Sequence, residues 1–98
     1  MTRIKLNARS RKMRPRTAIE VADIVQRFLD GTSLDPWEWD DFISVPLADP
    51  ALDSVRRRCA EIREEYPPAI PGTYCGPDGE DVLRFLIAGL REKSKRPM

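Results

Sequence analysis

Residues 35–42 read Asp35-Pro36-Trp37-Glu38-Trp39-Asp40-Asp41-Phe42, and this stretch holds both tryptophans of the chain. An aspartate before a proline is typical of a helix start, with Asp35 as the N-cap and Pro36 in the first helical position. Glu38, three residues after the cap, can accept a hydrogen bond from the cap backbone and complete a reciprocal pair. Because Pro46 cannot continue a helix, the pattern predicts a short helix over residues 36–44.

The two tryptophans of this helix are two positions apart, so one helix face cannot bury both. Trp39 has with Leu34 the spacing of a hydrophobic staple, and we expect it to anchor the core. Trp37 then shares the outer face with Asp40 and Asp41. An aromatic side chain among carboxylates is a candidate hot spot for a basic partner, so we predict a partner-binding site at these three residues. The alternative is that Trp37 packs on the preceding loop or on the N-terminal segment.

Two longer helices have similar start signals. Thr17 and Glu20 have the spacing of a capping box and begin a helix predicted over residues 18–30. Asp49, again followed by a proline, begins a helix predicted over residues 50–65. Apolar residues recur in both at the three- and four-residue steps of a packed helix face.

A fourth helix is predicted over residues 79–93. Its apolar residues, Phe85 among them, cover more than half of the circumference, which indicates a helix that is covered on two sides. We therefore expect this helix to be the central one, with Gly89 allowing a neighbour to come close.

Residues 66–78, between the third and fourth helices, are rich in proline and glycine and predict a long loop. A loop of this length without structure of its own is uncommon in a small domain. We expect it either to pack across the helices through Ile70, Tyr74 and Cys75 or to carry function.

The fold class that follows is all-α. We predict a single small domain of about four helices (18–30, 36–44, 50–65 and 79–93) with a long Pro/Gly loop. In domain terms, residues 17–93 form the helical domain, residues 1–16 are a basic flexible arm, and residues 94–98 are a flexible tail.

Charge is distributed unevenly along the chain, although its net value is only +1. The arm holds seven basic side chains and no acidic one, while residues 17–90 have a balance of −9. A mobile basic arm can neutralise the phosphates of a nucleic acid without a folded recognition domain. The arm is therefore a candidate nucleic-acid-binding segment. The alternative is that the arm neutralises its own acidic body or aids solubility. The candidate residues are Arg9, Arg11, Lys12, Arg14 and Arg16.

Catalytic and metal chemistry have little support in this sequence. The chain has no histidine and two distant cysteines, Cys59 and Cys75, so the commonest general base and a zinc site are missing. We expect no enzyme activity, no metal site and no cofactor. The acidic cluster around Asp40 and Asp41 is better explained as a solvated face, because adjacent aspartates on a helix point about 100° apart. With no signal-peptide pattern and no apolar run long enough to span a bilayer, a cytoplasmic location is expected and no membrane partner.

The runs Phe28-Leu29-Asp30-Gly31 and Asp35-Pro36-Trp37-Glu38-Trp39-Asp40-Asp41-Phe42-Ile43-Ser44 resemble a group of small bacterial proteins of uncharacterised function. The group shares a Trp-x-Trp-Asp-Asp-Phe signature, a following Asp-Pro helix start and a Tyr-Cys-containing loop before the last helix. The resemblance covers about residues 20–90 and omits the arm. It implies a fold and no functional site, because the group has no established activity.

The leading functional hypothesis is a small protein-interaction module, such as an immunity or antitoxin-like inhibitor that binds a basic protein. An acidic body attracts basic partners by electrostatic steering. The alternative is a nucleic-acid accessory protein that binds through the basic arm.

Overall fold

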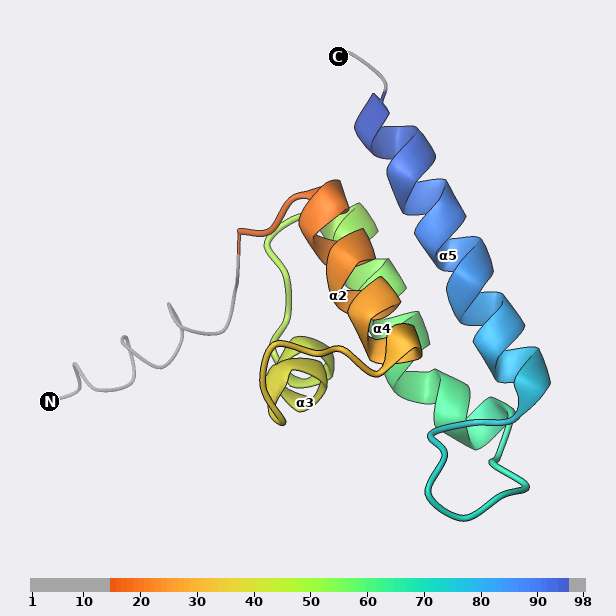
Figure 1. Cartoon of the computed structure of the whole chain (residues 1–98). Coiled ribbons are helices and arrows are strands. Elements are labelled where there is room, and N and C mark those ends of the chain that lie inside the picture. The colour runs from red at the N-terminus through yellow and green to blue at the C-terminus, as the bar shows by residue number, and fades with distance from the viewer. Residues whose placement is uncertain (1–14, 96–98) are drawn as a thin grey trace, which may run out of the picture.

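The structure is a computed structural model that describes residues 15–95 of the chain. Within this range it contains four helices, α2 to α5, and no strand, which confirms the predicted all-α fold (Figure 1). The expected mobile character of residues 1–14 and of residues 96–98 lies outside the described residues.

Helices α2 and α4 have the predicted bounds because their start signals are local. α2 spans Ala18–Asp30 and α4 spans Pro50–Glu65. The Thr17 hydroxyl accepts from the backbone N–H of Glu20 at 3.2 Å, and the Glu20 carboxylate accepts from the backbone N–H of Thr17 at 2.8 Å. The Asp49 carboxylate accepts from two backbone N–H groups of the first turn of α4. Both caps satisfy amide groups that a helix end leaves without partners.

Helix α3 spans Glu38–Ser44 and begins two residues later than predicted. Its N-cap is Trp37, which makes no side-chain cap, while the Asp35 carboxylate closes only the preceding turn by accepting from the Trp37 N–H at 2.8 Å. The predicted staple is also wrong, because Leu34 is 74% exposed. Glu38 makes no reciprocal cap; its carboxylate accepts hydrogen bonds from Arg27 of α2.

Helix α5 spans Pro77–Lys95, longer than predicted at both ends, and it lies along one side of the molecule (Figure 1). α5 packs against α2 and α4, whereas α2 and α4 each pack against both α3 and α5, so α5 is not the central helix that the pattern predicted. Phe85 is 76% exposed, and a Cβ at Gly89 would meet no atom within 4 Å, so neither lies against a neighbour. The wide apolar stripe of α5 therefore includes a buried inner face and an outer face that no other helix within residues 15–95 covers.

All four helices and the loop after α4 contribute to the core, and its aromatic part lies where α2 and α3 meet this loop. Phe28 of α2 stacks on Trp39 at a centroid distance of 3.9 Å, and the Tyr74 ring meets both edge-on. Offset and edge-to-face pairs of this kind add to the free energy gained from burial alone. Trp39 is thus the predicted core anchor, with Phe28 in place of Leu34 as its main contact.

The loop packs on the helices, one of its two predicted roles. The Tyr74 hydroxyl donates to the carbonyl of Cys59 at 3.1 Å, and Cys75 is buried, although Ile70 is not. The backbone N–H of Gly76 donates to the carbonyl of Tyr66 at 2.8 Å and closes the base of the loop. These contacts hold the last helix against the start of the loop.

Candidate partner-binding site

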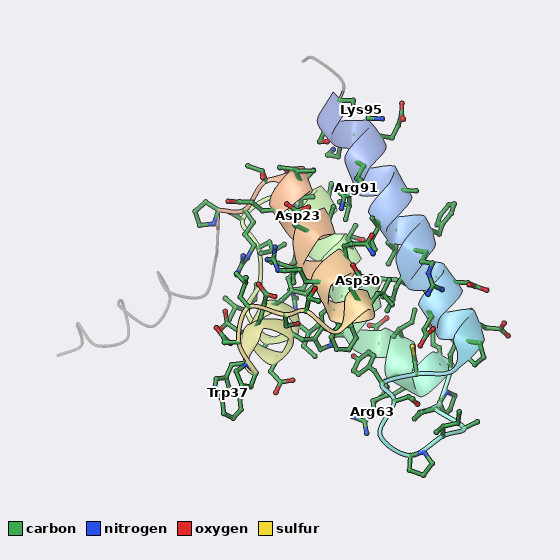
Figure 2. The ribbon with its side chains drawn as sticks, viewed as in Figure 1. Asp23, Asp30, Trp37, Arg63, Arg91 and Lys95 are labelled. Atoms are coloured by element: carbon green, nitrogen blue, oxygen red, sulfur yellow. The ribbon has the colours of Figure 1, made fainter. Side chains whose placement is uncertain are left out.

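Trp37 projects away from the helices at the end of the molecule where α3 lies (Figure 2). Its side chain is 69% exposed, so it does not pack on the loop that precedes α3, while packing on residues 1–14 lies outside the described part of the chain. Beside it is an open pocket of about 300 Å³ with three carboxylate side chains in its lining. The lining residues are Arg16, Leu34, Asp35, Trp37, Glu38 and Asp41.

The turn before α3 sets the direction of Trp37. The Asp35 carboxylate holds the Trp37 N–H, and the Trp37 carbonyl accepts from the backbone N–H of Asp41 at 2.8 Å. Because both backbone groups of Trp37 are bonded, the indole ring is carried on a fixed turn. Because the backbone of Trp37 is already ordered, the conformational entropy lost on binding at this residue is that of its side chain alone.

Glu38 is part of the lining of this pocket and is held by Arg27 of α2. Its carboxylate accepts from Arg27 Nε at 3.1 Å and Nη2 at 2.7 Å, and from the backbone N–H of Leu34 at 3.1 Å. The hydrogen bond from Arg27 keeps the pKa of Glu38 below its ordinary value, against the opposing effect of burial. Glu38 is therefore a structural carboxylate, and its charge is compensated inside the protein.

Arg16 lines the same pocket, which the sequence did not predict. Its guanidinium Nη2 lies 3.9 Å from the Asp41 Oδ2, and its side chain is only 23% exposed. Sequence reasoning assigned Arg16 to the arm because no local pattern connects it with α3. The other four candidate residues of the arm, Arg9, Arg11, Lys12 and Arg14, lie outside the described residues.

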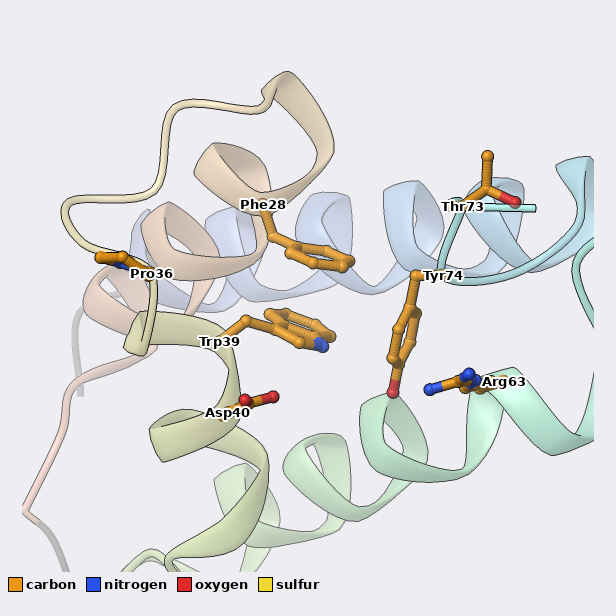
Figure 3. A pocket seen from close by; sticks show the side chains of 8 residues that line it. Phe28, Pro36, Trp39, Asp40, Arg63, Thr73 and Tyr74 are labelled. Carbon is orange, nitrogen blue, oxygen red and sulfur yellow. The ribbon is translucent and has the colours of Figure 1, made fainter. Parts of the chain in front are cut away.

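Asp40 lines a different pocket, so the structure divides the three predicted site residues between two cavities. This second pocket, of about 440 Å³, opens between α2, α3, α4 and the loop (Figure 3). Arg63 of α4 lies on its far side, with its guanidinium carbon 6.0 Å from the centroid of the Tyr74 ring. The pocket is lined by Phe28, Pro36, Trp39, Asp40, Arg63, Gly72, Thr73 and Tyr74. Gly72, Thr73 and Tyr74 of the loop thus form part of the wall of this pocket.

The three consecutive arginines of α4 are engaged with acids. Arg56 donates to Asp53 at 2.7 Å and to the carbonyl of Ile43 at 2.7 Å, and Arg57 lies 3.6 Å from the same carboxylate. The hydrogen bond from Arg56 lowers the pKa of Asp53, against the effect of burial. Arg58 pairs with Glu65. These contacts describe a salt-bridged helix surface better than a phosphate-binding patch.

Residues 15–95 contain no arrangement of side chains that suits metal binding or thiol catalysis. No set of three cysteine, aspartate or glutamate side chains in this part of the chain gathers in a way that could hold a metal ion. Cys59 and Cys75 are both buried, and burial raises the pKa of Cys59 to about 12. Burial also raises the pKa of Cys75. A thiol in this state is a poor nucleophile, because the thiolate is the reactive form.

Comparisons with protein-family models, with curated proteins and with solved structures found no match for this chain. The resemblance to the Trp-x-Trp-Asp-Asp-Phe group therefore stays a prediction. No helix between residues 15 and 95 combines the length and the apolar character that crossing a membrane requires.

Proposed function

We propose that this chain is a small non-enzymatic protein-interaction module that binds a basic protein, in the manner of an immunity or antitoxin-like inhibitor. The observation that carries the proposal is the exposed Trp37 ring beside a pocket that Asp35 and Asp41 make acidic. Interface hot spots are enriched in tryptophan, and charge around them selects the partner. We propose that the partner supplies an apolar contact to the indole and a cation to the pocket.

Arg16 supports the cationic half of this proposal. Its side chain lines the pocket with the guanidinium near Asp41, so a cation already lies beside this carboxylate. A carboxylate can accept two N–H groups of an arginine, which gives direction as well as attraction. We expect an arginine of the partner to take the open volume beside Arg16 or to replace it.

The negative charge of the helical domain supports the proposal that the partner is a basic protein. Residues 17–90 carry a balance of −9, and an acidic surface raises the rate of encounter with a basic protein. Asp40 lies across α3 in the second pocket, so a partner that contacts all three predicted residues must extend over the outer side of α3. We propose Trp37 and Asp41 as the centre of the footprint and Asp40 as part of its rim.

Affinity capture with the intact chain tests the site. Recovery of a basic partner should fall strongly with Trp37→Ala and with Asp41→Lys. The matched control is Glu64→Lys, which makes the same charge change at an exposed residue of α4 that lines neither pocket. If both site variants recover the partner as well as the native chain does, the site is elsewhere.

Growth of cells tests the inhibitory role. The captured basic protein should slow growth when it is produced alone, and co-production of the native chain should restore growth. Co-production of the Trp37→Ala variant should restore it less. If the captured protein does not slow growth when produced alone, the inhibitory role is wrong, and only the proposal that this chain is a binding module remains.

The nucleic-acid alternative rests on the uneven charge of the sequence, since seven of its basic side chains lie in residues 1–16 with no acid among them. Under this alternative the intact chain binds DNA or RNA at low salt, and binding weakens steeply as salt is raised. Deleting residues 1–14 should abolish that binding. Absence of binding by the intact chain at low salt would rule the alternative out.

A further inference from the structure

Helix α5 shares an apolar groove with α4. Figure 1 shows α3 and α5 on either side of the molecule, so this groove is separate from the proposed partner-binding site. It has a volume of about 200 Å³ and is formed by α4 and α5. Its lining consists of Ala51, Leu52, Val55, Phe85, Leu86, Gly89, Leu90 and Lys93.

Two features of α5 give this groove a projecting side chain and an open notch. Phe85 is largely exposed at one end of the lining, so most of its ring projects beyond the surface. Gly89, one helical turn further on, has no neighbour within 4 Å of the position that a Cβ would take, so the groove is open there. A projecting aromatic ring and an open notch on the same helix face are what a self-complementary two-fold interface needs.

We propose that a second copy of this chain covers the groove, with the two α5 helices antiparallel and related by a two-fold axis level with Ile87. In this register Phe85 of each copy lies level with Gly89 of the other and enters its groove beside Val55. The pairing is isologous: each ring fills the notch of the other copy, so both apolar faces are covered at once.

The same register brings opposite charges together. Asp81 and Lys93 are also symmetric about Ile87, so Asp81 of each copy lies level with Lys93 of the other. Both side chains are exposed. Within each copy the Asp81 carboxylate makes a surface contact with Arg84 at 3.3 Å, and such exposed pairs are weak enough to exchange. A parallel pairing would set Asp81 beside Asp81 and Lys93 beside Lys93, so charge favours the antiparallel one.

Sedimentation equilibrium of the full chain over a wide concentration range tests the proposal. The native chain should show a monomer–dimer equilibrium, and Phe85→Ser should weaken association by about tenfold or more. Because the Phe85 ring is exposed, this variant should keep the helical circular dichroism of the native chain. A native chain that stays monomeric at every concentration, or a Phe85→Ser variant that associates as well as the native chain, would overturn the proposal.

Charge reversal tests the register. Asp81→Lys and Lys93→Asp should each weaken the dimer, and the double variant should regain affinity to within about threefold of the native value, because it restores both pairs with opposite sign. Glu64→Lys is the control for net charge and should leave the dimer unchanged. A double variant weaker than either single variant would exclude this register, and a chain that binds another protein or a lipid vesicle through Phe85 while staying monomeric would exclude self-association.

Discussion

Two glycines of α5 differ in their surroundings and so should differ in their response to the same substitution. A Cβ at Gly79 would lie 2.8 Å from Cys75 Sγ and 3.0 Å from Tyr66 Cβ, whereas a Cβ at Gly89 would meet nothing within 4 Å. Gly79→Ala should therefore lower the free energy of unfolding by about 1–2 kcal/mol, since the close contacts outweigh the gain in helix propensity. Gly89→Ala should raise it by up to about 1 kcal/mol.

Urea unfolding at a concentration where the chain is monomeric measures both effects. The two variants make the same chemical change in the same helix, so each is the control for the other. Equal changes in stability at Gly79 and Gly89 would contradict the close approach of the loop to the start of α5.

Single residues also show which features of the site could be predicted from the sequence. The burial of Trp39 was predictable because helical periodicity separates it from Trp37. The position of Arg16 was not, since its contact with Asp41 joins residues that no local pattern relates. The same limit explains Leu34: its spacing fits a staple, but Phe28 from another helix takes the place against Trp39. The sequence therefore predicted the exposed Trp37 of the candidate site, but it did not predict that Arg16 lies beside Asp41.

Between elements, the ion pair of Arg27 and Glu38 joins α2 to α3, and it predicts a pH dependence. The pKa of Glu38 is held below its ordinary value of 4.5, first by the hydrogen bond from Arg27. A carboxyl whose pKa is lowered by folding stabilises the fold above its unfolded pKa, and that contribution is lost as the pH falls through the folded pKa. Glu38→Gln should cost about 1.5 kcal/mol at pH 7, and this difference from the native chain should shrink as the pH falls below 4.5.

Urea unfolding at several pH values checks this prediction. Glu64→Gln removes a carboxylate from an exposed position of α4 and serves as the control. If the stability difference of Glu38→Gln stays constant on acidification, or if the control shows the same narrowing, the contact with Arg27 does not determine the pH dependence.

The helices that were predicted with correct bounds are those whose ends are set by neighbours in sequence. Thr17, Glu20 and Asp49 satisfy amides within three residues of themselves, so α2 and α4 begin where the pattern indicated. The start of α3 was wrong because Glu38 is bonded across eleven residues to Arg27. The outer face of α5 was misjudged because periodicity shows that residues are apolar and not whether another element covers them.

On the scale of the whole molecule, the two cysteines report on opening of the fold. Cys59 and Cys75 are 0% and 4% exposed, and burial raises the pKa of both thiols. We therefore expect both to react with a thiol reagent at pH 7 at least about a hundredfold more slowly in the folded chain than in urea. Mass spectrometry of the labelled chain over time measures the two rates. Rapid labelling of either cysteine without denaturant would contradict the burial of that thiol.

The closed base of the loop between α4 and α5 makes it an attachment point for reporters. Because the hydrogen bond from Gly76 to Tyr66 ties the two ends together, extra residues between Ala69 and Ile70 lengthen a segment without separating its ends. Each doubling of a loop costs only about 0.6 kcal/mol of closure entropy. Both residues are exposed, and neither lines the pocket at Trp37 or the groove at Phe85. A short epitope or a fluorophore inserted here would leave both proposed surfaces open, so the same tagged chain can report on a partner and on self-association.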